Sequence, residues 1–368
     1  MPVNLQIRSA ESFAATEIYI SAAADRTADP QKQAREIFRG ILKTLRSKKA
    51  SIIQERIFAS RSVIEILRRE REAVFGDIDD GVAPAFLIGA ETKPAPFAAV
   101  QVHAVANNAK PQVIKLDNVP CGRILRLPDC TILTLSQIAA GHLATAEQQA
   151  KAMLEKAQAA LKKFNADFLC VPRTWMWLGD ILSWYDEFNG VRNKFYTECG
   201  TIGPGTRHSM PASTGIGLAP EGGGKCAMDL LAVLKPAESI EFFSAVGRQQ
   251  CALEYGSAFS RASAAVTPAG RTVFVSGTAS IDAEGETINV GDPEGQINTT
   301  IENVRAVLRD TNCSDNDVVQ AVAYCKTLDV LNVFDGIKEN IGWPWVTVVC
   351  DICRPELLFE IEATAMPR

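Results

Sequence analysis

Near the end of the chain, residues 353–365 read CRPELLFEIEATA and carry two glutamates, Glu360 and Glu362, two positions apart. In a β-strand, residues two apart share a face, so the two carboxyl groups are predicted to point the same way. Two interpretations are open. In the first, the pair lies on the half-solvated edge of a sheet. In the second, one carboxyl group lies at the mouth of a pocket and donates protons there as a general acid.

The cysteines and histidines do not show the spacing of a metal site. Ten cysteines and three histidines are scattered along the chain. The only C-x-x-C pair, Cys350 and Cys353, lies in VTVVCDIC, which is typical of a strand. Residues three apart on a strand face opposite sides, so this pair cannot bind one metal ion together. We therefore expect no metal site, and we interpret the cysteines mainly as reduced, buried side chains.

Charge and hydropathy narrow the class of protein. The 368 residues include 38 Lys and Arg against 43 Asp and Glu, a net charge of -5, which argues against a nucleic-acid-binding surface. No apolar run approaches the roughly 18 residues of a membrane span, and the N-terminal residues do not form a signal peptide. We expect a cytoplasmic protein that binds neither nucleic acid nor membrane.

An internal repeat gives the elements that position the glutamate pair. An Asp-Pro-x-x-Gln motif at residues 29–33 and again at 292–296 precedes an amphipathic stretch that ends in Leu-Arg. In both copies a β-rich run precedes this helix, and a second strand, a second helix and two closing strands follow. Residues 131–234 fit the same plan less cleanly, with Thr145 as the N-cap of the first helix. Each copy is predicted to fold as β-α-β-α-β-β.

The chain is therefore predicted to be an α+β protein of three tandem units, at residues 1–111, 112–247 and 248–368. The closing strand of the third unit carries the two glutamates. When the closing strands are superposed, Gln101 of the first unit falls opposite Glu360, and His103 falls opposite Glu362. Asp229 of the second unit falls near Glu360. Only the third unit keeps the Glu-x-Glu pair.

The third unit resembles the Rid/YjgF family, small α+β proteins whose fold is like that of the trimeric chorismate mutase. The resemblance rests on VFVSGTASI, on VVQAVAYCKTLDVLNVF and on the closing LLFEIEATA. Rid proteins are trimers with a ligand cleft between neighbouring subunits. Three fused units then imply a pseudo-trimer within one chain, for which a monomer is sufficient.

Several motifs are more narrowly similar to the chorismatases, which are built on this fold and cleave chorismate. They are VPRTW, YDEFNGVR, MPASTGIG, EYGSAFSRA, SGTASI and CRPELLFEIE, spread over the last 200 residues or so. The chain departs from that family after Arg-Thr-Trp, where Met176 and Trp177 replace an expected Asn-Tyr. This departure leaves the identity of the substrate open.

The resemblance implies that the first glutamate of the pair lines the cleft, so Glu360 is the predicted general acid and Glu362 a structural neighbour. Protonating the methylene carbon of an enolpyruvyl ether requires an acid with a raised pKa, which burial provides. Neither a metal nor an organic cofactor is needed. We predict release of pyruvate from chorismate or a close relative, leaving a dihydrodiol or a hydroxybenzoate.

A chorismate-like dicarboxylate also requires cationic and hydrogen-bonding partners, and the similar motifs supply candidates. The predicted substrate-binding residues are Arg192 and Arg261 first, then Arg173, Arg207, Tyr255, Tyr185, Thr214 and Cys353. Each has a structural alternative: salt bridges for the arginines, hydrogen bonds within the core for the tyrosines, and core packing for the cysteine.

Two other functions stay open. The first is a small-molecule-binding protein that keeps the fold without the chemistry, which the Met176-Trp177 departure favours. The second is a Rid-type imine deaminase. Those enzymes hold the substrate carboxylate with an arginine on the preceding strand, where this chain has Trp345. An arginine that binds a carboxylate through two hydrogen bonds is hard to replace, so this function ranks last.

Overall fold

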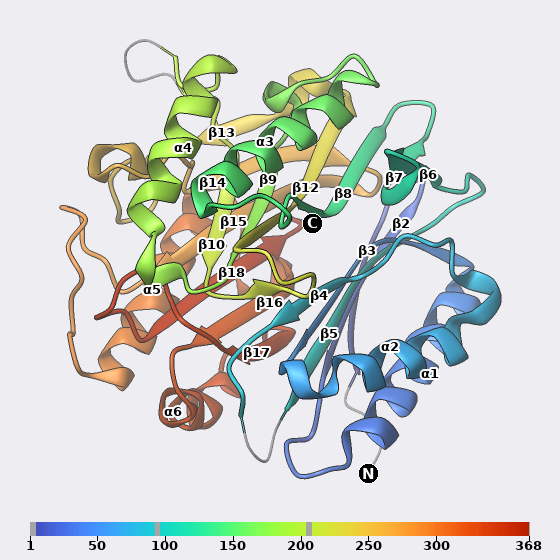
Figure 1. Cartoon of the computed structure of the whole chain (residues 1–368), viewed down its shortest axis with the longest axis horizontal. Coiled ribbons are helices and arrows are strands. Elements are labelled where there is room, and N and C mark those ends of the chain that lie inside the picture. Colours follow the sequence, from blue (N-terminus) through green and yellow to red (C-terminus); the bar gives the residue numbers. More distant parts are fainter. Residues whose placement is uncertain (1–4, 93–95, 204–207, 368) are drawn as a thin grey trace.

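The computed structural model describes residues 5–92, 96–203 and 208–367. It contains three six-stranded sheets, each with its own pair of long helices (Figure 1). The elements of the first unit are β1 (Leu5–Glu11), β2 (Thr16–Ala23), α1 (Pro30–Lys48), β3 (Ala50–Ala59), α2 (Ile64–Phe75), β4 (Ala85–Ile88) and β5 (Phe97–Ala106).

The second unit has two further strands at its start and a short one near its end. Its elements are β6 (Gln112–Leu116), β7 (Val119–Arg126), β8 (Thr131–Ala139), α3 (Ala146–Lys162), β9 (Arg173–Leu178), α4 (Tyr185–Glu198), β10 (Ala212–Ile216), β11 (Ala219–Pro220) and β12 (Cys226–Lys235). The third unit ends on the strand that carries the glutamates. Its elements are β13 (Glu241–Phe243), β14 (Ala262–Thr267), β15 (Gly270–Ala279), α5 (Pro293–Asp310), β16 (Val318–Cys325), α6 (Leu328–Lys338), β17 (Trp345–Val349) and β18 (Phe359–Ala365).

The three sheets share one topology. Their central strands run in the orders β2-β5-β3-β4, β8-β12-β9-β10 and β15-β18-β16-β17. In each case the last two strands are parallel and the other neighbours antiparallel. The predicted fold class, three α+β units of β-α-β-α-β-β, is confirmed.

Several strands were not predicted. β1, the hairpin β6-β7 and the pair β13-β14 each extend the leading edge of a sheet, and β11 joins the first sheet by pairing with β4. β13 begins before residue 247, where the second boundary was placed. The unit boundaries themselves stay predictions.

The repeated Asp-Pro motif has a local physical role. Asp29 and Asp292 cap α1 and α5, accepting hydrogen bonds from the backbone N–H groups of Lys32 and Gly295, and a proline follows each cap. Thr145 caps α3 in the same way. A capping side chain satisfies an otherwise unpaired N–H, and proline at the first helical position fixes the backbone for the helix.

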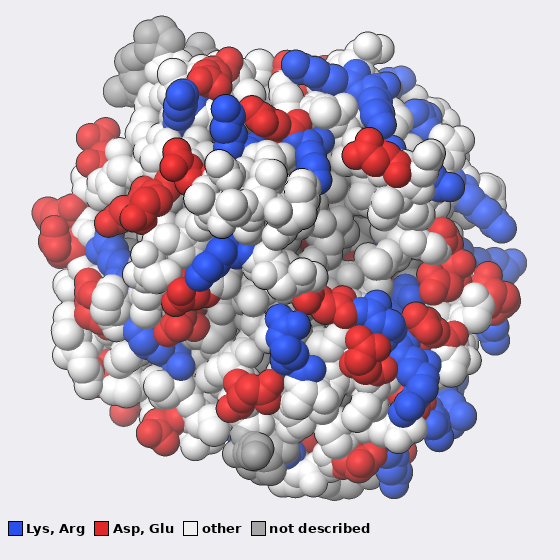
Figure 2. All heavy atoms as spheres, in the orientation of Figure 1, with Lys and Arg blue, Asp and Glu red and all other residues white. Residues whose placement is uncertain are grey.

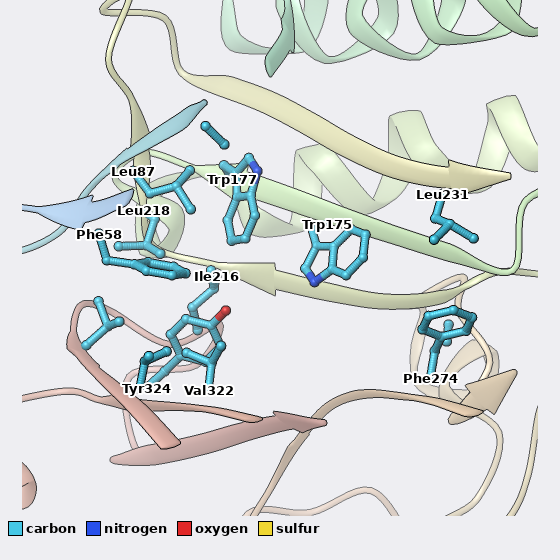
Figure 3. Close-up of a cluster of buried hydrophobic side chains, with 14 of the residues drawn as sticks. Phe58, Leu87, Trp175, Trp177, Ile216, Leu218, Leu231, Phe274, Val322 and Tyr324 are labelled. Atoms are coloured by element: carbon cyan, nitrogen blue, oxygen red, sulfur yellow. The ribbon is translucent and has the colours of Figure 1, made fainter. Parts of the chain in front are cut away.

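Four large apolar clusters of described residues hold the units together. Three of them lie between one sheet and its own two helices. The fourth is central and draws side chains from all three sheets, including Phe58 of β3, Trp175 and Trp177 of β9, and Tyr324 of β16 (Figure 3). The sheets therefore pack inner face to inner face, which is the arrangement expected of a pseudo-trimer.

One face of the molecule carries both signs of charge (Figure 2). Lys and Arg side chains alternate with Asp and Glu over the face in Figure 2. No helix among the described residues is long and apolar enough to cross a membrane.

Candidate active site

A cavity of about 120 Å³ lies at the boundary between the second and third units. The second unit supplies the first turns of α4 and the strand β10; the third supplies β18, the end of β15, the segment from Tyr255 to Arg261, and the turn before β18. Six of the predicted site residues line the cavity: Glu360, Arg192, Arg261, Tyr185, Tyr255 and Cys353.

Glu360 lies on β18, between β15 and β16 in the interior of the sheet. Its residue is 4% exposed and Glu362 is 5% exposed, so the half-solvated edge considered for this pair is wrong. Burial raises the pKa of the Glu360 carboxyl to about 8; Glu362 adds to this rise and Arg173 opposes it. About ten Glu360 side chains are then protonated for each one ionised at pH 7.

Two local features position the Glu360 carboxyl. The α5 side chain of Gln296 accepts from the backbone N–H of Leu358 and donates to the carbonyl of Glu356, which fixes the start of β18. Opposite, the pairing of β15 with β18 is irregular between Val275 and Thr278. Gly277 lies in this irregularity, and a Cβ atom added there would fall within 3.0 Å of Glu360 Oε1, closer than real Cβ atoms come.

Gly277→Ala is expected to displace the Glu360 carboxyl while leaving the fold intact. Gly277 does not have a positive φ, so alanine costs little in backbone conformation, and the clash falls mainly on a side chain. We expect the Glu360 pKa to change and any Glu360-dependent turnover to fall at least about tenfold, because small misplacements of a catalytic group are costly.

Gly336→Ala is the matched control, since nothing described lies within 4 Å of a Cβ added there. Thermal melting of both variants checks the fold. Unchanged turnover in a folded Gly277→Ala protein would show that the glycine has no role in placing Glu360.

Arg192 and Arg261 are almost fully buried, 1% and 2% exposed, and both line the cavity. Arg192 donates to Asn189 Oδ1 at 2.6 Å, and Arg261 donates from Nε to the carbonyl of Gln250 at 2.9 Å. Neither makes an ion pair with an acidic side chain among the described residues. Arg192 Nε and Arg261 Nη2 are buried without any hydrogen-bond partner there. Buried cations are normally paired, so these two donors are suited to an anionic ligand.

Aromatic rings allow these cations to lie close together. The guanidinium carbons of Arg192 and Arg261 lie 5.8 and 5.4 Å from the ring centre of Phe259. Arg261 and Arg354 each lie 5.3 Å from the ring of Tyr255. Ring faces attract cations, which offsets part of the repulsion between the guanidinium groups.

Arg354 precedes a proline and was not among the predicted substrate-binding residues. The structure places it in the cavity lining, half-buried, donating to the carbonyl of Gly285 at 2.8 Å. Asn189 and Ser257 also line the cavity and were not predicted. Asn189 lies one helical turn before Arg192, and this i, i+3 spacing is the signal that identifies it as a partner.

Two tyrosines and a cysteine of the lining are uncharged at neutral pH. Burial raises the pKa of Tyr185, Tyr255 and Cys353 above their ordinary values. Cys353 lies in the turn before β18 rather than in a strand. It is a thiol at neutral pH and not a thiolate nucleophile.

Two predicted site residues lie outside this lining. Arg173 is 1% exposed and donates from Nη2 to Glu362 Oε2 at 2.9 Å and to Thr214 Oγ1 at 2.7 Å. It is thus engaged behind the cavity wall, and Thr214 is its hydrogen-bond acceptor. Both side chains contact other protein groups in this structure, and their predicted ligand contacts stay predictions. Arg207 lies outside the described residues.

Two further sequence observations can be placed. Met176 and Trp177 are fully buried in apolar clusters and do not line the cavity, so their departure from the chorismatase pattern does not alter this pocket. Trp345 packs against Phe334 and Trp343 and is also absent from the lining.

Known proteins share both the sequence of the third unit and the fold of the whole chain. A family model described as Endoribonuclease L-PSP matches residues 255–367. A RutC family protein of Pyrococcus abyssi is 40% identical over 100 residues, which cover 26% of this chain and 79% of the relative. This chain belongs to the RutC family. That family is the Rid/YjgF group, so the predicted resemblance is confirmed.

A crystal structure of a chorismatase matches the full RutC-family chain. It covers 98% of this chain and 100% of the chorismatase, with a TM-score of 0.65 and 17% sequence identity. At this identity the match establishes a common fold. The whole chain therefore has the same fold as the chorismatase.

Proposed function

We propose that this protein cleaves the enolpyruvyl ether of chorismate, or of a close relative, and releases pyruvate. One observation carries the proposal: the buried, protonated carboxyl of Glu360 shares a cavity with Arg192 and Arg261, two buried arginines without an acidic partner among the described residues. Such a cavity favours a dianion with a group that needs protonation. The fold shared with a chorismatase adds support.

The cavity charges match a dianionic substrate. Arg192, Arg261 and Arg354 contribute three positive charges, while Glu360 is mainly neutral near pH 7. Asp186 is the other acidic lining residue, and it is exposed to water. The first turn of α4 also lies at the cavity, and its helix dipole favours negative charge there.

In the proposed reaction, Glu360 donates its proton to the methylene carbon of the enolpyruvyl group, and a new C–H bond forms. The adjacent ether carbon becomes an oxocarbenium ion. Water attacks that carbon and returns a proton to the Glu360 carboxylate. The resulting hemiketal collapses by breaking the bond from this carbon to the ring oxygen, which gives pyruvate and a ring alcohol. Attack by the ring hydroxyl instead of water closes a cyclic ketal. Breaking one ring C–O bond, with transfer of the proton from the neighbouring ring carbon to the released oxygen, makes the ring aromatic and leaves a hemiketal, which collapses to pyruvate and a hydroxybenzoate.

The test is incubation of the purified protein with chorismate, with pyruvate followed through a coupled lactate dehydrogenase. One pyruvate per chorismate consumed is the expected result. Calorimetry measures binding in parallel. Tight binding of chorismate without pyruvate release would identify a small-molecule-binding protein in place of the enzyme. If the protein neither binds chorismate nor releases pyruvate, both functions are overturned.

An imine deaminase is less well supported. In imine deaminases of this group, an arginine on the preceding strand holds the substrate carboxylate. This chain has Trp345 at that position, and Trp345 does not line the cavity. The arginines that do line the cavity lie on α4, after β13 and in the turn before β18, not at the start of β17.

A further inference from the structure

The two carboxyl groups of β18 have different surroundings although they share a face of the strand. Glu362 accepts a hydrogen bond at each oxygen: from Arg173 Nη2 to Oε2 at 2.9 Å and from Trp175 Nε1 to Oε1 at 3.0 Å. Both donors belong to β9 of the second unit, so Glu362 is held from across the unit boundary. No hydrogen bond to the Glu360 carboxyl comes from the part of the chain that the structure describes.

This asymmetry fixes which carboxyl keeps its proton. Two buried carboxylates close to each other do not both ionise readily, because each charge opposes the other. Glu362 forms an ion pair with Arg173 and has a second donor in Trp175, whereas Glu360 has no such donor among the described residues. The ionisation of Glu360 then meets both burial and a fixed negative charge two residues away on the same face.

We propose that Glu362, clamped by Arg173 and Trp175 of the neighbouring unit, is a positioning residue that keeps the Glu360 carboxyl protonated. Its effect on catalysis rests on the function proposed above. The protonation of Glu360 does not depend on that function and can be measured without substrate.

The other charged groups around Glu360 act in the opposite direction or not at all. Arg173 from β9 lowers the Glu360 pKa, and the cations lining the cavity, Arg192, Arg261 and Arg354, also favour the carboxylate. Asp186 of α4 faces water, where its field is screened.

The remaining titratable neighbours are neutral near pH 7. Burial raises the pKa of Tyr185 on α4, of Tyr255, and of Cys350 and Cys353 before β18. Glu362 is therefore the buried anion, among the described neighbours, that opposes ionisation of Glu360.

The described closing strands of the other two units do not carry such a pair. In the first unit, Gln101 donates to the carbonyl of Ala321 at 3.3 Å, and His103 lies 2.8 Å from Glu17. In the second, Asp229 forms an ion pair with Arg56 at 3.4 Å. An acidic group without a partner beside a clamped one occurs on the third closing strand, where the cavity is.

The test is a titration of the protein labelled with ¹³C at the glutamate carboxyl groups. The Glu360 resonance is assigned by its loss in Glu360→Gln, and it should titrate near pH 8 in the unmodified protein. In Glu362→Gln its midpoint should fall by at least about one unit, because a like charge is lost and Arg173 stays. Glu339→Gln removes the same charge from an exposed helix end and should leave the midpoint unchanged.

Glu362→Gln leaves Arg173 buried without an anion, which can prevent folding. The double variant Arg173→Gln, Glu362→Gln removes both charges and should fold, with a midpoint that falls by less. A midpoint within about half a unit of the unmodified protein in a folded Glu362→Gln variant, or a midpoint in the double variant that does not fall, overturns the proposal.

The alkaline limb of pyruvate release should move with the Glu360 midpoint. A moved midpoint without pyruvate release in any variant refutes the proposed reaction and keeps the role of Glu362. Pyruvate release with an unmoved midpoint supports the proposed reaction and overturns the role of Glu362.

Discussion

Glu360→Gln is expected to lower kcat for pyruvate release by roughly 10³-fold, within the range of general acid catalysis. Glutamine keeps the shape and the amide can occupy the same space, but it has no proton to donate to the methylene carbon. The arginines that face the substrate are untouched, so KM should change little. Steady-state assays with chorismate separate the two parameters. Glu339→Gln, with the same change at an exposed position, should behave like the unmodified protein.

The same variant gives a second readout that needs no substrate. Glu360 has an ordinary pKa of 4.5 and about 8 in the folded protein, so between these values the folded state holds a proton that the unfolded state has lost. This group's stability contribution is present below about pH 4.5 and is lost as pH rises through about 8, by up to roughly 1.4 kcal/mol per pH unit.

Glu360→Gln lacks this dependence. The difference in free energy of unfolding between variant and unmodified protein should therefore grow from pH 5 to pH 8 in favour of glutamine, and then level off. Denaturant unfolding at several pH values measures it. A difference independent of pH would mean that Glu360 is ionised in the folded protein and is not the acid.

Strand alternation and helix caps made much of this fold predictable. The spacing of Glu360 and Glu362 correctly placed both on one face, and the Asp-Pro motif correctly marked the starts of α1 and α5. These signals are local, because a cap or a strand face depends on residues a few positions apart. The leading strands β1, β6, β7, β13 and β14 were not predicted, since edge strands lack a strong apolar pattern of their own.

The site was less predictable where roles depend on pairing between units. Arg173 and Arg192 both occur in motifs similar to those of chorismatases; Arg192 ranks ahead of Arg173 as a predicted substrate-binding residue, but the sequence does not reveal what each arginine pairs with. The structure separates them. Arg173 donates a hydrogen bond to Glu362 of the third unit, whereas Arg192, among the described residues, donates to the side-chain oxygen of Asn189. The need for glycine at 277 likewise follows from an irregular strand pairing that the sequence does not reveal.

Three fused units allow the three unit boundaries to diverge. At the first-to-second boundary, the guanidinium of Arg56 lies 3.7 Å from the centre of the Trp175 ring and forms an ion pair with Asp229. This buried cation therefore has its partners within the protein. At the second-to-third boundary, Arg192 and Arg261 have no such partner among the described residues. A homotrimer would repeat one solution three times, whereas a single chain can keep stability at one boundary and binding capacity at another.

Neutralising Arg192 or Arg261 should have the largest effect on substrate affinity. Arg192→Met and Arg261→Met remove a buried charged donor while keeping much of the contact with Phe259. A hydrogen bond to a charged group contributes about 1.5–3 kcal/mol, so each variant should weaken chorismate binding by roughly 10- to 100-fold. Calorimetry measures the affinity. Arg46→Met, which removes an exposed arginine paired with Asp77 on the surface, is the control.

Stability should change in the opposite direction, and this separates a binding role from a structural one. An arginine that holds the fold through an ion pair destabilises the protein when it is removed, because its partner is left buried and charged. Arg192 and Arg261 leave no such partner among the described residues, and methionine relieves the cost of burying an unpaired cation. The two variants should therefore melt at the same temperature as the unmodified protein or higher, while binding is lost. A lowered melting temperature with unchanged affinity would identify both arginines as structural, and the cavity would then lack its anion-binding groups.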